Sequence, residues 1–163
     1  MHCPSSNLKL ASGIAPIAAL LRAGVRVALG TDGAASNNRL DLFQEMRLAA
    51  LLAKAAAKDA EAMPAHVALR CATLEGAIAL GLEKTIGSIA PGKSADLVAV
   101  RLDSHQLLPV YDPVSHLVYA CGREDVSDVW VSGEPIVRNG ELLHLDSSDL
   151  QRRARLWQTN ILN

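Results

Sequence analysis

Apolar residues recur at helical spacing in four separate stretches of the chain. In residues 14–23, apolar positions from Ile14 to Leu21 follow the i, i+3, i+4, i+7 pattern of a helix with one buried face. Gly24 follows, at the position where a glycine commonly ends a helix. The same periodicity predicts further helices over about residues 40–58, 64–82 and 148–162.

Short runs rich in Val and Ile predict strands. The first run, residues 25–30, lies between two predicted helices and is typical of a buried strand in an α/β unit. The composition changes near residue 84, and the strands predicted after it cover residues 87–89, 96–100, 126–131 and 135–137. The Asn139-Gly140 dipeptide after the last strand predicts a tight hairpin turn.

The composition is that of an ordinary globular protein. Of the 163 residues, 50% are hydrophobic and 20% are charged, which excludes disorder. A formal net charge of −1 gives no reason to expect nucleic acid or an anionic membrane as a partner. No apolar run reaches the ~18–20 residues of a membrane helix, and the N-terminus lacks a secretory signal pattern. Three cysteines are too few for a disulfide framework, so we expect a reducing, cytoplasmic location.

The sharpest candidate for chemistry is Asp32, in the sequence Gly30-Thr31-Asp32-Gly33 directly after the first predicted strand. A carboxylate at the carboxyl end of a buried parallel strand lies where α/β proteins bind ligands. The flanking glycines allow a tight turn and the close approach of a ligand. The alternative interpretation is structural, because an aspartate here can also cap the turn or the next helix.

The other candidate groups form no complete motif. His2, Cys3 and Ser5 in the polar cluster of residues 2–7 suggest nucleophilic catalysis, but no Gly-x-Ser-x-Gly sequence accompanies them. A loop with capping serines is the simpler interpretation. The five histidines include no His-x-His pair and no His-Glu-x-x-His motif, so the sequence contains no complete metal site.

Five segments together resemble the C-terminal part of amidohydrolase-superfamily enzymes. In chain order they are HCPSSNLKLASGIAP, VALGTDGAASNN, IGSIAPGKSADLVAV, PVYDPVSHLVYA and VSDVWVSGEPI. The combination of GTDGAASNN with PGKSADLVAV is specific for the ATZ/TRZ group of this superfamily. PVYDPVSHLVYA points more narrowly to its adenosine-type members, the 5′-methylthioadenosine/S-adenosylhomocysteine deaminases. The resemblance covers essentially the whole chain.

The resemblance implies an α/β fold built from parts of two domains. These are the last strands and helices of a metal-dependent (β/α)8 hydrolase barrel, then part of a β-sandwich domain and a C-terminal helix. Residues 1–83 would belong to the barrel, residues 84–145 to the sandwich, and residues 146–163 would form the helix. The strand at residues 25–30 would be the eighth barrel strand, and HCPSSN the loop after the seventh.

The same resemblance implies roles for single residues. Asp32 would be a metal ligand and the catalytic proton shuttle, in an enzyme that uses Zn²⁺ or another divalent metal to deaminate an adenine-type base. The residues that would lie near the purine nucleoside-type substrate are Ser36, Asn38, His2 and Asn7. For Ser36 and Asn38, capping of the helix that begins near residue 40 is the structural alternative.

The family's other metal ligands have no counterpart in this sequence. The His-x-His pair of the first barrel strand and the histidines of the fifth and sixth strands are absent, and a complete barrel takes roughly 250 residues. We therefore expect a fragment that binds zinc weakly and has negligible deaminase activity alone. We also expect it to associate with the missing N-terminal segment or with itself. A parent acting on guanine or a triazine, and a non-catalytic assembly module, are the alternatives.

Overall fold

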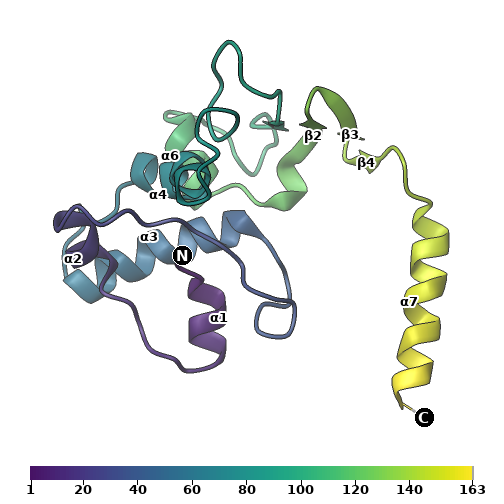
Figure 1. Cartoon of the computed structure of the whole chain (residues 1–163), viewed down its shortest axis with the longest axis horizontal. Coiled ribbons are helices and arrows are strands. Elements are labelled where there is room, and N and C mark those ends of the chain that lie inside the picture. Colours follow the sequence, from purple (N-terminus) through teal and green to yellow (C-terminus); the bar gives the residue numbers. More distant parts are fainter. Residues whose placement is uncertain (163) are drawn as a thin grey trace.

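The computed structural model describes residues 1–162, which form a helical body, a small sheet and a separate C-terminal helix (Figure 1). The helices of the first half are α1 (Pro4–Lys9), α2 (Ile17–Arg22), α3 (Leu42–Ala57), α4 (Ala65–Ala72) and α5 (Leu74–Ala79). The second half contains β1 (Leu97–Val100), α6 (Pro113–Tyr119), the 3-10 helix η1 (Arg123–Asp125), β2 (Val126–Val131), β3 (Glu134–Arg138), β4 (Glu141–Leu142) and α7 (Ser147–Leu162). None of the helices in this described part is long and apolar enough to cross a membrane.

Helix α3 is at the centre of the hydrophobic core. Its buried face carries the small side chains of Ala49, Ala50 and Ala53, which allow neighbouring helices to approach closely. Helices α1, α2, α4 and α6 all pack against α3 (Figure 1). The buried core residues are Ile17, Val27, Leu29, Met46, Ala49, Ala50, Ala53, Met63, Ala68, Cys71 and Val118. The helix predicted over about residues 40–58 is therefore confirmed.

The strand predicted at residues 25–30 is wrong as a regular strand. The structure has one isolated parallel bridge there, between His2 and Leu29. It is made by hydrogen bonds from the His2 N–H to the Ala28 carbonyl (2.7 Å) and from the Gly30 N–H to the His2 carbonyl (3.0 Å). Val27 and Ala28, directly before the bridge, are buried as the pattern predicts, whereas Val25 and Arg26 are exposed. A regular strand needs a neighbour along its length, and the described chain supplies only the short segment at His2.

The helix predicted at residues 64–82 is divided into α4 and α5. Thr73, at the break, has φ −125° and ψ −92°, which is not helical. The carbonyl of Cys71 accepts a hydrogen bond from the Leu29 N–H (2.9 Å), and the Thr73 hydroxyl donates to the Leu69 carbonyl (2.8 Å). In a continuous helix these carbonyls would accept from the amides four residues later. The break therefore involves a tertiary contact with the segment that leads to Asp32.

The sheet is antiparallel, with the strand order β1-β2-β3-β4. Two-residue turns join its last three strands, at Ser132-Gly133 and at Asn139-Gly140. All four turn residues have positive φ, as tight type I′ hairpins require. The hairpin at Asn139-Gly140 and the strands predicted after residue 95 are thus confirmed. The strand predicted at residues 87–89 is wrong, because Gly87 adopts a φ of +86° in a bend.

Two short helices lie where the sequence pattern predicts none. Helix α1 occupies the predicted polar loop at residues 2–7 and has Pro4 in its first turn, where a missing N–H costs nothing. Helix α6 likewise begins with a proline, and the Asp112 carboxylate before it accepts a hydrogen bond from the Val114 N–H (3.0 Å). Helix α1 has no side-chain cap at its start, and both helices pack against α3 without a long apolar repeat.

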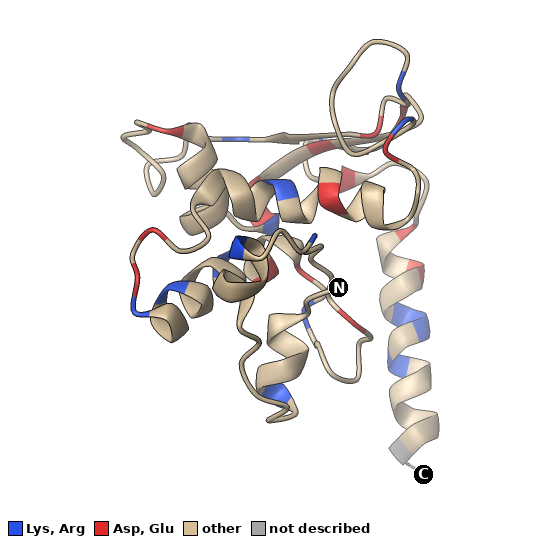
Figure 2. Ribbon diagram, turned by 60° about the vertical axis from the view of Figure 1, so that its left-hand side comes forward, with Lys and Arg blue, Asp and Glu red and all other residues tan. Residues whose placement is uncertain are grey.

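Helix α7 stands apart from the helical body (Figure 1). It confirms the helix predicted at residues 148–162, whereas Asn163, the end of the predicted C-terminal segment, lies outside the described residues. From Ser147 to Ile161 every side chain except that of Asp149 is exposed. Figure 2 shows acidic and basic residues interspersed over the helical body, with several basic residues along α7.

Candidate functional site

Asp32 lies in the loop that joins the Leu29 bridge to α3, and its side chain is exposed. Its φ of 61° is in the left-handed region, which aspartate tolerates better than most residues. Two hydroxyl groups orient the carboxylate, since Ser6 Oγ and Ser36 Oγ each donate a hydrogen bond to Oδ2 over 2.8 Å. Within the part of the chain that the structure describes, Asp32 belongs to no ion pair.

Hydrogen bonding favours the ionised form of Asp32. The hydroxyl of Ser6, then that of Ser36 and the backbone N–H of Gly33, lower the pKa of the Asp32 carboxyl from its ordinary value. At neutral pH the site therefore presents an exposed carboxylate. Such a group can coordinate a divalent cation, or accept a proton and return it. The contact with the Gly33 N–H also supports the alternative interpretation of Asp32 as a structural residue, because through it the carboxylate stabilises its own turn.

Ser36 and Asn38 both lie in the Asp32 loop, and neither caps α3. The N-cap is Asp41, whose carboxylate accepts hydrogen bonds from two backbone N–H groups of the first turn (3.0 and 3.4 Å). Ser36 instead donates to Asp32, and Asn38 Oδ1 accepts a hydrogen bond from Lys9 Nζ on α1 (2.7 Å). The capping alternative for these two residues is therefore wrong. Their contact with a substrate stays a prediction.

His2 and Asn7, the two other predicted substrate contacts, have different surroundings. His2 is buried beside the segment that leads to Asp32, and burial lowers the pKa of its imidazole while the Glu45 carboxylate opposes that shift. Asn7 is half-buried on α1, directly after Ser6. In this helix it is the Ser6 side chain that reaches Asp32.

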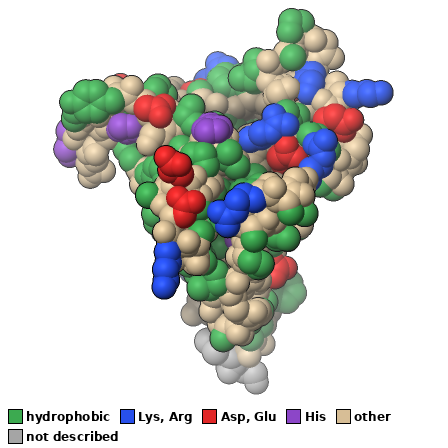
Figure 3. Space-filling model, turned by 90° about the vertical axis from the view of Figure 1, so that its left-hand side faces the viewer, with side chains coloured by type: hydrophobic (Ala, Val, Ile, Leu, Met, Phe, Trp, Pro, Cys, Tyr) green, Lys and Arg blue, Asp and Glu red, His purple; other side chains and the backbone are tan. Residues whose placement is uncertain are grey.

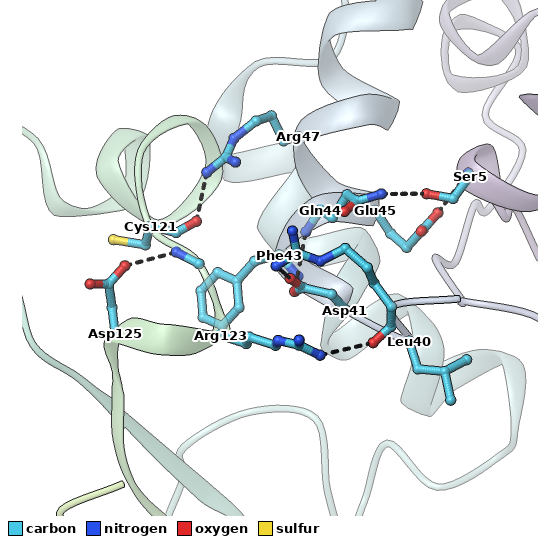
Figure 4. Close-up of polar contacts among 12 residues, drawn as sticks. Ser5, Leu40, Asp41, Phe43, Gln44, Glu45, Arg47, Cys121, Arg123 and Asp125 are labelled. Atoms are coloured by element: carbon cyan, nitrogen blue, oxygen red, sulfur yellow. Dashed lines mark hydrogen bonds and ion pairs between the residues drawn. The ribbon is translucent and has the colours of Figure 1, made fainter. Parts of the chain in front are cut away.

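No local sequence pattern points to two further residues of the site, Ser6 and Glu45. Ser6 precedes Asp32 by 26 residues, so no local spacing links the two. Glu45 reads as one polar residue of an amphipathic helix, but its side chain is completely buried. Figure 4 shows the Glu45 carboxylate beside Ser5, whose backbone N–H donates to Oε2 over 3.0 Å. For Ser6, one sequence signal points to a shared site with Asp32, because the segments HCPSSN and GTDGAASNN that contain them both belong to the family resemblance.

The described residues do not form a complete metal site. They contain no group of three or more His, Cys, Asp or Glu side chains that could hold a metal ion. Asp32 offers one carboxylate, whereas catalytic zinc typically has three protein ligands. Burial and the negative charge of Asp32 raise the pKa of the neighbouring Cys3 thiol, which disfavours the thiolate that zinc binds. Taken alone, this donor set does not fit zinc.

The fold and the site together define a segment of an α/β protein with a single carboxylate in the loop after an isolated parallel bridge and a small antiparallel sheet further along the chain. The sequence pattern of the Amidohydrolase family matches residues 1–136. The chain therefore belongs to the amidohydrolase family, and the resemblance inferred from its motifs is confirmed.

Two curated relatives show how much of a longer protein the chain matches. It is 50% identical over 161 residues to a 5-methylthioadenosine/S-adenosylhomocysteine deaminase of Teredinibacter turnerae, covering 99% of this chain and 36% of that protein. A protein of the same name from Moorella thermoacetica is 52% identical over 149 residues, which are 91% of this chain and 35% of that protein. The chain thus spans about a third of the length of these relatives.

Solved structures agree with the fold. An adenosine deaminase from Xanthomonas campestris with bound zinc is 53% identical, with a TM-score of 0.96 over 98% of this chain and 36% of that chain. The zinc complex of atrazine chlorohydrolase from Arthrobacter aurescens is 31% identical, with a TM-score of 0.87 over 95% of this chain and 34% of that chain. The predicted fold class is confirmed by these similarities.

Proposed function

We propose that this chain is the aspartate-bearing part of a metal-dependent aminohydrolase that deaminates 5′-methylthioadenosine/S-adenosylhomocysteine-type purines. The observation that carries the proposal is the Asp32 carboxylate, exposed, ionised and oriented by two hydroxyls in the loop after the Leu29 bridge. The relatives that match almost the whole chain at 50–53% identity support the reaction class, because their names are those of deaminases.

In this proposal Asp32 is one metal ligand and the proton shuttle. A divalent metal in the parent enzyme would supply a water molecule with a lowered pKa. Ser6 and Ser36 hold Oδ2 and favour the anionic form of the carboxyl, so the group is ready to accept a proton. It can then deliver that proton to the leaving amine, which departs as ammonia. Ser36, Asn38, His2 and Asn7 remain proposed substrate contacts.

The remaining metal ligands would come from outside this chain, which spans about 36% of the Teredinibacter relative. We propose that residues 1–83 complete a barrel with that other part, that residues 84–145 join a sandwich domain, and that residues 146–163 form an outer helix. Exposed apolar side chains support a missing covering segment or a second copy (Figure 3). Those near the Asp32 loop and the Leu29 bridge are Val25, Leu40 and Leu42.

A chimaera tests the proposed function. This chain replaces the matching 36% of the Teredinibacter turnerae deaminase, and ammonia release from methylthioadenosine and S-adenosylhomocysteine is measured together with bound zinc. We expect the chimaera to be active, and Asp32→Asn to lower kcat by about 10²- to 10⁴-fold, because proton transfer by a positioned group contributes that much. The chain alone should release no ammonia and hold less than one zinc per molecule.

The matched control is Asp59→Asn. Asp59 follows the end of α3, whereas Asp32 precedes its start, so the length of the helix, about 24 Å at 1.5 Å per residue, lies between them. This variant should keep the activity of the chimaera. Turnover with stoichiometric zinc by the chain alone would contradict the incomplete site, and an active Asp32→Ala chimaera would favour a non-catalytic assembly module.

A substrate panel separates the proposed reaction from its neighbours in the family. The similarity to triazine hydrolases at 31–32% identity is the specific reason to include a chlorotriazine, and guanine represents other aminated heterocycles. We expect the adenosine-type substrates to react faster. A preference for the triazine or for guanine would replace the proposed substrate while keeping the reaction class.

A further inference from the structure

Glu45 is a completely buried carboxylate in the first turn of α3. Both of its oxygens are used, since Oε1 accepts a hydrogen bond from Asn37 Nδ2 (2.8 Å) and Oε2 accepts one from the Ser5 N–H (3.0 Å). Figure 4 shows the second of these contacts across the gap between α1 and α3. No cation pairs with Glu45 among the ion pairs of the described chain. A buried charge without a cation is costly, so the two hydrogen bonds are needed to stabilise the Glu45 carboxylate in the interior.

Each residue that donates a hydrogen bond to Glu45 is next in sequence to a residue that donates one to Asp32. Ser5 precedes Ser6 on α1, and Asn37 follows Ser36 in the loop. Ser6 and Ser36 each place a hydroxyl on Asp32 Oδ2 at 2.8 Å. The buried Glu45 carboxylate therefore holds both segments that orient Asp32. In each segment its contact is with the residue next to the serine that donates to Asp32.

Further contacts strengthen this connection. Asn37 Nδ2 also donates to the Thr31 carbonyl (2.9 Å), directly before Asp32, and Gln44 Nε2 donates to Ser5 Oγ (3.2 Å). Asn37 is itself buried, so its amide depends on these partners. The loop that carries Asp32 is consequently attached to α3 at a rigid, buried point.

We propose that Glu45 is a positioning residue for Asp32, acting through Ser5–Ser6 and Asn37–Ser36. The role in catalysis rests on the proposed function, whereas the role in holding the loop does not. A glutamine at position 45 has one acceptor oxygen and one NH₂ group, so it cannot accept from both N–H donors. An aspartate keeps both oxygens and the charge but is shorter by one methylene and cannot reach both donors equally well.

The first experiment uses NMR of the full 163-residue chain. In Glu45→Gln the side-chain ¹³C carboxyl signal of Asp32 at pH 7 should move in the same direction as in the Ser6→Ala/Ser36→Ala variant. Amide exchange at Ser36 and Asn37, whose N–H groups donate to the Gly33 carbonyl, should accelerate at least about tenfold. Glu45→Asp, which keeps the charge and is the safer variant for folding, should move the same signals less. An unchanged Asp32 signal in a folded Glu45 variant would overturn the proposal.

Glu75→Gln is the matched control. Glu75 lies on α5 with its side chain only 12% exposed, and it accepts from Arg70 Nε (2.7 Å) and Arg26 Nη1 (3.5 Å) rather than from the Asp32 loop. Its replacement should lower stability without moving the Asp32 signal. If the control moves that signal as much as Glu45→Gln does, general loosening explains the effect and the proposal is wrong.

The second experiment measures kcat and KM separately in the chimaera. Glu45→Gln should lower kcat by up to about 10²-fold, the cost of misplacing a catalytic group by about 1 Å, with KM changed less than about twofold. Adding Ser6→Ala and Ser36→Ala should lower kcat far less in the Glu45→Gln chimaera than in the chimaera without that change, because Glu45→Gln has already displaced the two hydroxyls. Additive effects would contradict the proposal. An inactive parent chimaera would count against the proposed function, while the NMR experiment would still decide the role of Glu45.

Discussion

At the scale of single residues, the notable feature of Asp32 is that hydroxyl groups, rather than cations, hold it. A carboxylate in an ion pair with Arg or Lys is already neutralised, whereas Ser6 and Ser36 stabilise the anion and leave its charge for another partner. Asp32 has a left-handed backbone with φ 61°, and its side chain is exposed to solvent. Orientation and ionisation therefore come from the same two contacts.

The pH dependence of Asp32 follows from those contacts. Its pKa is lower in the folded chain than in the unfolded one, so it stabilises the fold above the unfolded pKa, and this contribution is lost as the pH falls through the lowered value. In the Ser6→Ala/Ser36→Ala variant we expect the pKa of Asp32 to rise toward the ordinary value, measured by ¹³C carboxyl NMR titration. Asp146, whose pKa is lowered by Ser148, is the internal control and should titrate unchanged. Equal upward shifts of both groups would mean that the variant has lost its fold.

At the scale of elements, the start of α3 determines where the Asp32 loop ends. Asp41 is buried, accepts two N–H groups of the first turn and lies 3.5 Å from an Arg39 guanidinium nitrogen. Asp41→Ala should lower the free energy of unfolding by about 1 kcal/mol, the typical value of an N-cap, as measured by urea denaturation. Asp41→Asn is the matched control and should cost clearly less, because asparagine also caps helices. Equal losses in the two variants would show that the charge rather than the cap matters.

Elements with a long periodic pattern could be predicted from the sequence, and elements defined by tertiary contacts could not. Helices α3 and α7 have that repeat, and the hairpin at Asn139-Gly140 has a turn that needs positive φ. The break at Thr73 involves the bond from Leu29 to the Cys71 carbonyl, which no local window contains. The strand predicted at residues 25–30 is wrong for a related reason. The apolar run predicts the burial of Val27–Leu29, but whether it pairs as a strand depends on a neighbouring segment distant in sequence.

The candidate site was predictable to a similar degree. Asp32 could be proposed because a carboxylate after a buried apolar run is a local signal, strengthened by the resemblance of the surrounding motif. Ser6 and Glu45 could not, since their contacts with Asp32 and Ser5 span 26 and 40 residues of sequence. The supporting residues of a site are those whose positions depend on the complete fold.

At the scale of the whole molecule, the uneven burial of the chain is its most informative property. The helical body has a continuous core around α3, whereas α7 exposes nearly all of its side chains, including those of Leu150, Trp157 and Ile161. An isolated helix of this length is marginal in water, because helices in proteins owe most of their stability to packing. The core of this chain and its C-terminal helix are therefore energetically separate.

Removal of α7 tests this separation. A chain of residues 1–146 should keep the urea midpoint of the full chain, with a free energy of unfolding within about 0.5 kcal/mol, since the deleted side chains are exposed like ordinary surface residues. Ile17→Ala in the full chain is the positive control, and this buried core change should cost about 2–5 kcal/mol. A loss comparable with that of Ile17→Ala would mean that α7 packs against the helical body in solution. An unchanged midpoint would show that the exposed apolar side chains of α7, among them Trp157 and Ile161, contribute little to the stability of this chain.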